Sequence, residues 1–201
     1  MENTLDAILS AAKAEFSEKG FKSASPHNIL KTAGMTTGAF YGYYKSKEEL
    51  FDALVGKQYA ESMGMFTETQ DKFSELPPDE QRENMGKHSG DGMRRMMDYA
   101  YVNKDIFKLL LCASEGAKYE NMVHEMAEIE VDATHRFADV MKKAGYAKYA
   151  VDPILEHMLV SGLFSAFFEV IIHDIPCEKA YEYLKEPKEF YTADRHKIMG
   201  I

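Results

Sequence analysis

The stretch from residue 25 to residue 47 constrains the fold of this chain more than any other. Ser25-Pro26 is typical of a helix start, because serine caps helices and proline favours the first helical position. Gly34 suits a tight turn, and Thr36 can cap the helix that follows it. Ser46-Lys47-Glu48-Glu49 has the spacing of a capping box opening a further helix. Two short helices joined by a tight turn form a helix-turn-helix, which places its second helix in a DNA major groove.

Apolar residues on both sides of this stretch repeat with helical spacing. Leu5, Ile8, Ala12 and Phe16 predict a helix over 4–19 that Gly20 ends in a left-handed conformation, with Phe21 folding back. The fourth helix is expected to run on through Leu50 and Leu54. Further helices are expected at 93–102, 105–114, 119–145, 151–173, 176–186 and 187–199, with a break at 76–79 and a kink or loop at 86–92. No segment alternates as a strand does, so the chain is predicted to be all-α.

The charge is divided unevenly along the chain. Residues 1–50 hold six lysines and six acidic residues, so the whole net charge of −9 lies in residues 51–201. Phosphate repels an acidic surface, which leaves the neutral N-terminal part as the expected DNA surface. We therefore predict a three-helix DNA-binding head over 1–50, with a connecting helix over 47–73. The larger helical body over 51–201 is the predicted ligand-binding and dimerisation domain.

Three ordered motifs in the head carry a family resemblance. They are Ala14-Glu15-Phe16-Ser17-Glu18-Lys19-Gly20-Phe21, Ala33-Gly34-Met35-Thr36-Thr37-Gly38-Ala39-Phe40-Tyr41 and Tyr44-Lys45-Ser46-Lys47-Glu48-Glu49-Leu50. With them, residues 5–54, a quarter of the chain, resemble the N-terminal domain of the TetR family of bacterial transcriptional regulators. The family often has lysine where Thr37 stands and histidine where Gly42 stands. These departures remove cationic contacts, so the operator sequence cannot be read from the motif.

The predicted DNA contacts are polar side chains in or beside the helix-turn-helix, together with a glycine that lets the backbone approach closely. The resemblance places Thr36, Thr37, Gly38, Tyr41, Tyr43 and Lys47 first. The full predicted set is Ser25, His27, Thr36, Thr37, Gly38, Tyr41, Tyr43, Lys45 and Lys47. Phe40 and Tyr44 are expected to pack the core of the head. The alternative is that the hydroxyls only cap helices and Tyr41 only packs.

The body is rich in methionine and aromatic residues, which suit an adaptable apolar cavity, although an ordinary core uses the same residues. The residues predicted to bind a ligand are Met96, Tyr99, Phe107, Met122, Met126, Phe164 and Phe168. The resemblance implies a pocket in this region without assigning its residues.

The apolar helix expected at 151–173 carries small residues that let a second helix approach. In the resembled family the last long helices pair between two copies, which would place two recognition helices about 34–36 Å apart on DNA. The predicted dimer contacts are Leu155, Leu159, Gly162, Ala166 and Val170. The alternative is that this helix is the buried centre of a monomeric body.

No metal, cofactor or catalytic site is predicted. His124, Glu128 and His135 share one helical face, but His135 lies about 16 Å along the axis from His124, too far for one ion. No nucleophile is paired with a base, so the chain is predicted not to be an enzyme. Cys112 and Cys177 are isolated, as expected for thiols in a reducing cytosol.

No membrane association is predicted. The apolar stretch Leu159–Ile172 is interrupted by Ser161, Ser165 and Glu169, so it is not expected to span a membrane. The N-terminus has no basic residue before Lys13, so it is not expected to be a signal peptide. The sequence therefore predicts a cytoplasmic, homodimeric regulator, a repressor released from an operator in double-stranded DNA by a small apolar or aromatic effector. The alternatives are a similar DNA-binding protein that activates or has no switch, and an all-helical enzyme or carrier.

Overall fold

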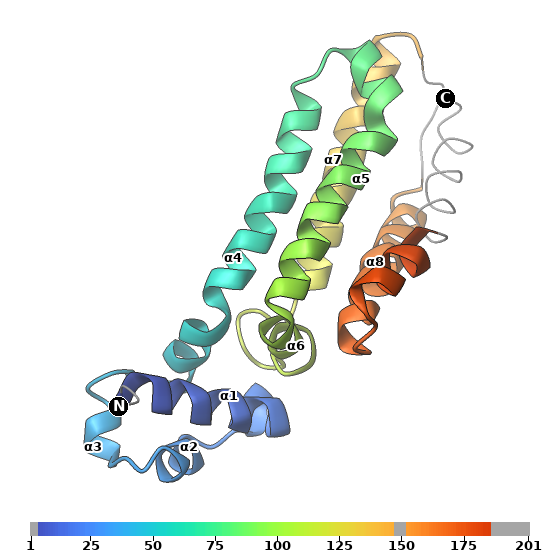
Figure 1. The fold of residues 1–201 in the computed structure, drawn as a ribbon. Coiled ribbons are helices and arrows are strands. Elements are labelled where there is room, and N and C mark those ends of the chain that lie inside the picture. The colour runs from blue at the N-terminus through green and yellow to red at the C-terminus, as the bar shows by residue number, and fades with distance from the viewer. Residues whose placement is uncertain (1–3, 147–151, 186–201) are drawn as a thin grey trace. The chain divides into compact units, whose positions relative to one another are not determined.

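The computed structural model describes residues 4–146 and 152–185, and these ranges contain helices and no strand (Figure 1). The helices are α1 (Thr4–Ser23), α2 (Pro26–Thr32), α3 (Thr37–Phe40), α4 (Lys47–Ser74), α5 (Pro78–Val102), α6 (Lys104–Cys112), α7 (Met122–Lys143) and α8 (Pro153–Ile172). Residues 177–185 are also helical. The all-α prediction is confirmed. The helix expected at 187–199 lies outside the described residues.

The chain divides into two compact units. Unit 1 comprises Met1–Glu61 and Asn103–Met122, and unit 2 comprises Ser62–Val102 and Val123–Ile201. Helix α4 contributes residues to both. Unit 1 thus contains the predicted head and extends beyond residue 50, because α1 packs against α6 as well as α2. The functions predicted for the head and the body remain predictions.

Gly20 ends the regular part of α1. Its φ of 72° lies in the left-handed region, where a glycine has no Cβ to clash, and the last turn of α1 follows this kink. Phe21 then turns into unit 1, where its N–H donates to the carbonyl oxygen of Ala113 at 2.7 Å. Its ring centroid lies 6.0 Å from that of Phe16. The predicted stop at Gly20 and the return of Phe21 are confirmed.

Gly34 makes the turn between α2 and α3. Its φ is 67°, and after it the N–H of Met35 donates to the carbonyl oxygen of Leu30 at 2.9 Å. Helix α3 is a single turn, in which the N–H of Phe40 donates to the carbonyl oxygen of Thr36 at 3.2 Å. The predicted helix-turn-helix is confirmed, with a short second helix.

Phe51 on α4 is the centre of the unit 1 core. Its side chain is 1% exposed, and its ring centroid lies 4.9 Å from Phe16, 5.2 Å from Phe21 and 6.2 Å from Tyr119. These contacts join α4 to α1 and to the segment after α6. Leu54 is only half-buried, so the buried face of α4 lies toward Phe51.

Residues 86–92 belong to the continuous helix α5, so the predicted kink or loop is wrong. Gly92 is at the point where α5 approaches α4 closely in unit 2. A Cβ on Gly92 would lie 2.5 Å from Cγ2 and 2.9 Å from Oγ1 of Thr69. The Thr69 hydroxyl is itself fixed by donating to the Met65 carbonyl oxygen at 2.8 Å. Gly92 therefore serves helix packing, a use that sequence reasoning mistook for helix breaking.

Gly92→Ala is expected to lower the free energy of unfolding by about 1–2 kcal/mol, since overpacking exceeds the gain in helix propensity. Gly86 is the matched control, because nothing lies within 4 Å of a Cβ placed there. Gly86→Ala is expected to raise stability by about 0.5–1 kcal/mol. Urea unfolding followed by circular dichroism measures both. Adding Thr69→Ala should restore the Gly92 variant, whereas equal effects at both glycines would contradict the close packing.

Asp152 and Pro153 begin α8 as predicted. The Asp152 carboxylate accepts hydrogen bonds from the N–H groups of Ile154 at 2.9 Å and Leu155 at 3.0 Å, and proline takes the first position of the helix. This cap fixes where α8 starts in unit 2.

Helix α8 is long and apolar enough to cross a membrane by length and composition, which the sequence interpretation had excluded for this stretch. No other helix of the described ranges meets this test. Six of its large apolar side chains are buried in unit 2, namely Val160, Phe164, Phe167, Phe168, Val170 and Ile171. Packing within unit 2 thus accounts for much of its apolar character.

Candidate nucleic-acid interface

The residues predicted to contact DNA lie at the start of α2, on and before α3, and in the segment that leads to α4. Tyr41 and Tyr43, just after α3, are 61% and 50% exposed. The other exposed members are His27, Thr36, Thr37, Gly38 and Lys45, while Ser25 and Lys47 are partly buried. Helix α3 and its flanks therefore present hydroxyl and phenol groups to the surface, as contacts to phosphates and base edges require.

Phe40 anchors α3 in the head. Its ring is buried, with the centroid 5.5 Å from Tyr41 and 6.1 Å from Tyr44. Burial raises the pKa of the half-buried Tyr44, so its phenol stays neutral. The prediction that Phe40 and Tyr44 pack rather than contact a partner is confirmed for Phe40, and Tyr44 is half-buried.

Glu15 on α1 accepts hydrogen bonds from donors at the start of α2. Ser25 occupies the N-cap position, but its hydroxyl makes no capping bond. Instead Oε1 of Glu15 accepts hydrogen bonds from the N–H of Ser25 at 3.1 Å and the side-chain amide of Asn28 at 3.3 Å. The bond from Ser25, then those from Lys19 and Asn28, hold the pKa of Glu15 below its ordinary value of 4.5. Ser25 thus occupies the predicted N-cap position, but its hydroxyl does not form the capping hydrogen bond.

Lys47 closes the C-terminal end of α1. Its ammonium donates to the carbonyl oxygens of Phe21 at 2.7 Å, Lys22 at 3.3 Å and Ala24 at 3.4 Å. The same Nζ lies 4.5 Å from the centroid of the Phe21 ring. A cation at unpaired carbonyls stabilises a helix end. The sequence predicts Lys47 as a DNA contact, and such a contact would require these bonds to be given up.

The predicted capping box at α4 is half formed. The N–H of Glu49 donates to the Ser46 hydroxyl at 3.2 Å, as the motif requires. The Glu49 carboxylate, however, accepts from the N–H of Lys45 at 2.7 Å, one residue before the expected donor. This bond fixes the backbone of the exposed segment between α3 and α4.

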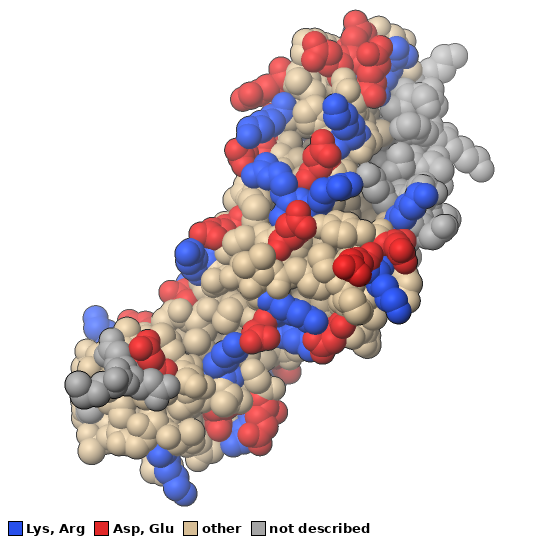
Figure 2. Space-filling model, viewed as in Figure 1, with Lys and Arg blue, Asp and Glu red and all other residues tan. Residues whose placement is uncertain are grey.

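The lysines of the head differ in their partners. Three lysines of α1 form ion pairs, Lys13 with Asp105 at 2.8 Å, Lys19 with Glu15 at 3.1 Å and Lys22 with Glu115 at 2.7 Å. Within the described ranges, the ammonium groups of Lys31 on α2 and Lys45 form no ion pair. In the view of Figure 2 the surface over α2 and α3 carries few charges. The uncompensated positive charge of the head therefore lies beside the helix-turn-helix, and sequence reasoning missed Lys31.

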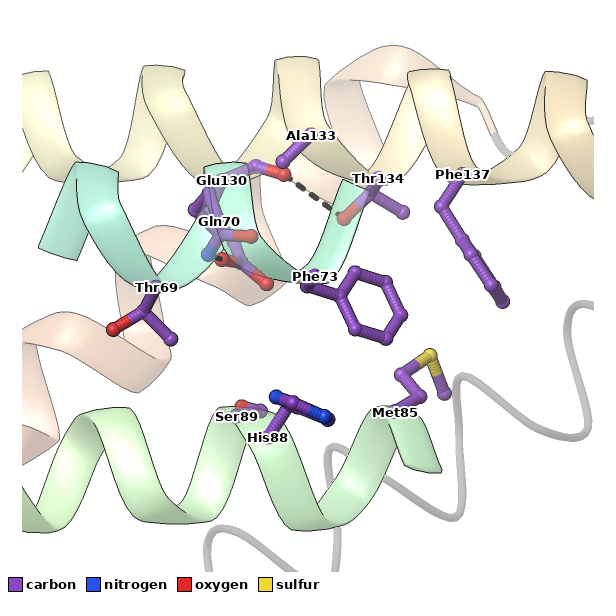
Figure 3. Close-up of a pocket in the computed structure, with 10 residues that line it drawn as sticks. All are labelled: Thr69, Gln70, Phe73, Met85, His88, Ser89, Glu130, Ala133, Thr134 and Phe137. Atoms are coloured by element: carbon purple, nitrogen blue, oxygen red, sulfur yellow. Dashed lines mark hydrogen bonds between the residues drawn. The ribbon is translucent and has the colours of Figure 1, made fainter. Parts of the chain in front are cut away.

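A small cavity lies among α4, α5 and α7 in unit 2 (Figure 3). Glu130 fixes the polar side chains that line it. The Glu130 carboxylate accepts a hydrogen bond from the Gln70 side-chain amide, and its backbone carbonyl oxygen accepts one from the Thr134 hydroxyl at 2.9 Å. Phe73, Met85 and Phe137 form the apolar side. The cavity measures about 40 Å³, far below the roughly 300–1,000 Å³ of drug-sized sites. A space of this size has room for water molecules and not for a drug-sized effector.

A larger cavity of about 450 Å³ lies along α5, α8 and residues 177–185. Met93, Met97 and Phe167 give it apolar walls, and Arg94 supplies a cation near the ring of Tyr181, 5.7 Å from the centroid. Its volume falls in the range of small-molecule sites.

The seven residues predicted to bind a ligand line neither of these cavities. All but the half-buried Tyr99 are buried, namely Met96, Phe107, Met122, Met126, Phe164 and Phe168. Two of them, Phe107 and Met122, belong to unit 1 rather than to unit 2. The structure thus places these side chains in the packed cores, the alternative weighed for them from sequence.

The predicted dimer contacts follow α8 along one side. Leu155 is exposed, and Leu159, Gly162 and Ala166 are partly exposed. Val170 is buried in unit 2, so it is not available to a second copy, and its assignment is corrected. Ile154 and Met158, not predicted, are exposed beside Leu155 and extend the apolar surface.

Residues 8–54 match the model of the bacterial regulatory proteins of the tetR family. The N-terminal head belongs to this family. YdgC of Bacillus subtilis (strain 168), an uncharacterised HTH-type transcriptional regulator, is 46% identical over 48 residues, 24% of this chain and 25% of that protein. The chain spans about a quarter to a third of the length of the curated relatives it matches.

Solved structures extend the tetR-family likeness to the fold of the whole chain. A transcriptional regulator (TerR/AcrR family) from Aquifex aeolicus VF5 has a TM-score of 0.51 and 21% identity, over 94% of this chain and 99% of that one. NalD of Pseudomonas aeruginosa, the secondary repressor of the MexAB-OprM multidrug efflux pump, has a TM-score of 0.55 and 18% identity, over 94% and 95%. At these identities the likeness establishes the fold of the body and not its ligand.

Proposed function

We propose that this chain is a sequence-specific DNA-binding transcriptional regulator that places α3 in the major groove. The observation that carries the proposal is the tetR-family match over residues 8–54. In this head Thr36 just before α3, Thr37 on it and Tyr41 and Tyr43 after it are all exposed. Ser25, His27 and Lys45 would contact the backbone on either side. Lys31 joins this set because its ammonium is exposed on α2 without an ion pair in the described ranges.

We propose that the regulator binds as a homodimer through α8. Exposed Ile154, Leu155 and Met158 form an apolar surface of the kind that marks interaction sites. A two-fold pair of heads would double the few phosphate contacts that one nearly neutral head offers, and affinity for DNA grows with their number.

We propose repression that an effector relieves, with the effector in the 450 Å³ cavity. Met93, Met97 and Phe167 favour an apolar molecule, and Arg94 favours one that carries an anionic group. Helix α5 holds three of these residues and ends at Val102, immediately before α6 of unit 1. An effector that fits better when α5 is displaced would shift the population toward a state with weaker DNA binding.

The test is binding to a fluorescent duplex of the upstream region of the gene, beside a duplex of shuffled sequence. Tyr41→Ala is expected to weaken specific binding about 5- to 150-fold, which is the loss of a good contact of about 1–3 kcal/mol. Tyr183→Ala is the matched control, since this tyrosine is 55% exposed in unit 2. Wild-type affinity should fall steeply with salt.

Equal binding of wild type and Tyr41→Ala to both duplexes would overturn the DNA-binding role of α3. Decanoate serves as an apolar anionic probe on the same assay. Release of DNA on its addition would support the switch, whereas an unaffected complex for it and for neutral aromatic probes would leave a regulator without one.

A further inference from the structure

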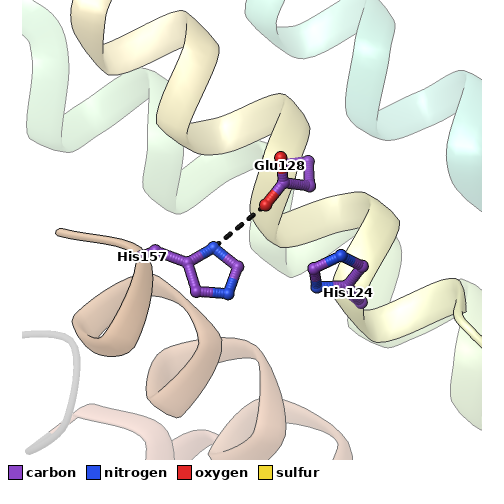
Figure 4. Close-up of side chains that lie close together, drawn as sticks. All are labelled: His124, Glu128 and His157. Carbon is purple, nitrogen blue, oxygen red and sulfur yellow. Dashed lines mark ion pairs between the residues drawn. The ribbon is translucent and has the colours of Figure 1, made fainter. Parts of the chain in front are cut away.

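Two histidines and a glutamate meet on the surface of unit 2 where α7 packs against α8. His124 and Glu128 lie one turn apart on α7, and His157 lies in the first turns of α8 (Figure 4). One ligand atom from each side chain lies within 4.8 Å of the other two. His135 shares this face of α7, and the sequence had excluded it because of its distance along the helix; its Nε2 pairs with Glu156 at 2.8 Å.

We propose that His124, Glu128 and His157 form a site for a divalent transition-metal ion of the zinc class that bridges α7 and α8. Two imidazoles and one carboxylate are a donor set that zinc takes in proteins, with a fourth position open to water. In a tetrahedral zinc site neighbouring ligand atoms are about 3.4 Å apart, given bonds of about 2.0–2.1 Å. The side chains therefore need to close by little more than 1 Å.

Two of the three side chains are already in contact, so the adjustment falls mainly on His124. Nδ1 of His157 lies 3.0 Å from the Glu128 carboxylate, and the rings of His124 and His157 meet at 73° with centroids 5.4 Å apart. On the far side of the His157 ring, Nε2 lies 3.4 Å from the hydroxyl of Ser161. A metal ion would take the place of the proton between Nδ1 and Glu128, and Nε2–H could then donate to the Ser161 hydroxyl. A hydrogen bond of this kind orients metal-binding histidines. All three side chains keep some solvent exposure, so an ion can enter.

The proposal does not rest on the regulatory function, because its readouts are metal binding and stability. Calorimetric titration of the full chain with ZnCl₂ should show one ion per chain, and excess zinc should raise the melting temperature by linkage. His157→Gln and His124→Gln should each weaken zinc binding at least about tenfold, since loss of even an orienting partner costs about 10–100-fold.

His173→Gln, at the C-terminal end of the same helix, is the matched control. His173 also pairs with a glutamate one turn away, with Nε2 2.9 Å from Glu169, but it belongs to no three-ligand group in the described ranges. This variant should bind zinc as the wild type does. A further control, Cys112→Ser with Cys177→Ser, separates thiol binding from the site.

X-ray absorption of the zinc-loaded wild type should show nitrogen and oxygen ligands only. Unchanged zinc affinity in the His124 and His157 variants, or loss of binding in the cysteine variant alone, would overturn the proposal. Absence of zinc binding by the wild type would leave the cluster as an ion pair with an adjacent ring and would overturn it equally.

Discussion

Phe51→Ala is expected to lower the free energy of unfolding of unit 1 by about 3–5 kcal/mol, the cost of truncating a buried phenylalanine. The side chain is 1% exposed and contacts Phe16, Phe21 and Tyr119, so no neighbour can fill the space without releasing another contact. The loss would undo the packing of α4 against α1, on which the placement of α2 and α3 depends. DNA binding should therefore be lost together with the fold of the head.

Leu54→Ala is the control for Phe51→Ala, because Leu54 lies on the same helix and is half-buried. It is expected to cost about 1 kcal/mol, a fraction of the value for a fully buried leucine. Urea unfolding followed by circular dichroism and tyrosine fluorescence measures both variants. A larger cost at Leu54 than at Phe51 would mean that α4 turns the other face to the core.

The sequence predicts local backbone features of this fold more reliably than it predicts which face of a long helix, such as that of Leu54 or of Phe51, is buried. Three local signals with one physical cause each were reliable, namely the left-handed stop at Gly20, the turn at Gly34 and the cap at Asp152. Each depends on the backbone needs of a few neighbouring residues, which the residue type states directly. The phase of a long helix depends instead on what packs against it, and the apolar pattern of α4 is broad enough to fit more than one phase.

Contacts between residues from distant parts of the chain could not be predicted from the sequence either. Lys47 was predicted only as a DNA contact, because its carbonyl partners, Phe21, Lys22 and Ala24, lie more than twenty residues away along the chain. The helix-breaking reading of 86–92 failed because Thr69 on another helix requires Gly92 there. His157 was not considered with Glu128 because the two belong to different helices. In each case the residue type indicated a special role, but the sequence did not identify the residue that it contacts.

The sequence predicted which residues of the head are exposed better than it predicted which residues line a ligand pocket. A head of some fifty residues has few positions on α3 and its flanks, and the buried Phe40 fixes which of them point outward. Methionine and aromatic residues fill a core as readily as they line a cavity, so composition alone cannot separate the two.

Phe164 tests that distinction directly, because the sequence placed it at a ligand and the structure places it in the core. Its side chain is 2% exposed and meets Phe66 edge-on, with centroids 5.3 Å apart. Phe164→Ala is expected to lower the free energy of unfolding by about 3–5 kcal/mol, through lost burial and the cavity left behind. Urea unfolding gives the value.

Phe73→Ala is the matched comparison for Phe164→Ala. Phe73 is half-buried and already borders the 40 Å³ cavity, so its loss is expected to cost about 1.5–2 kcal/mol. An apolar cavity left by Phe164 should bind benzene, so benzene should raise the melting temperature of that variant and not of the wild type. Equal costs for both phenylalanines, with benzene stabilising the wild type as well, would mean that Phe164 faces an existing space, as the sequence pattern predicted.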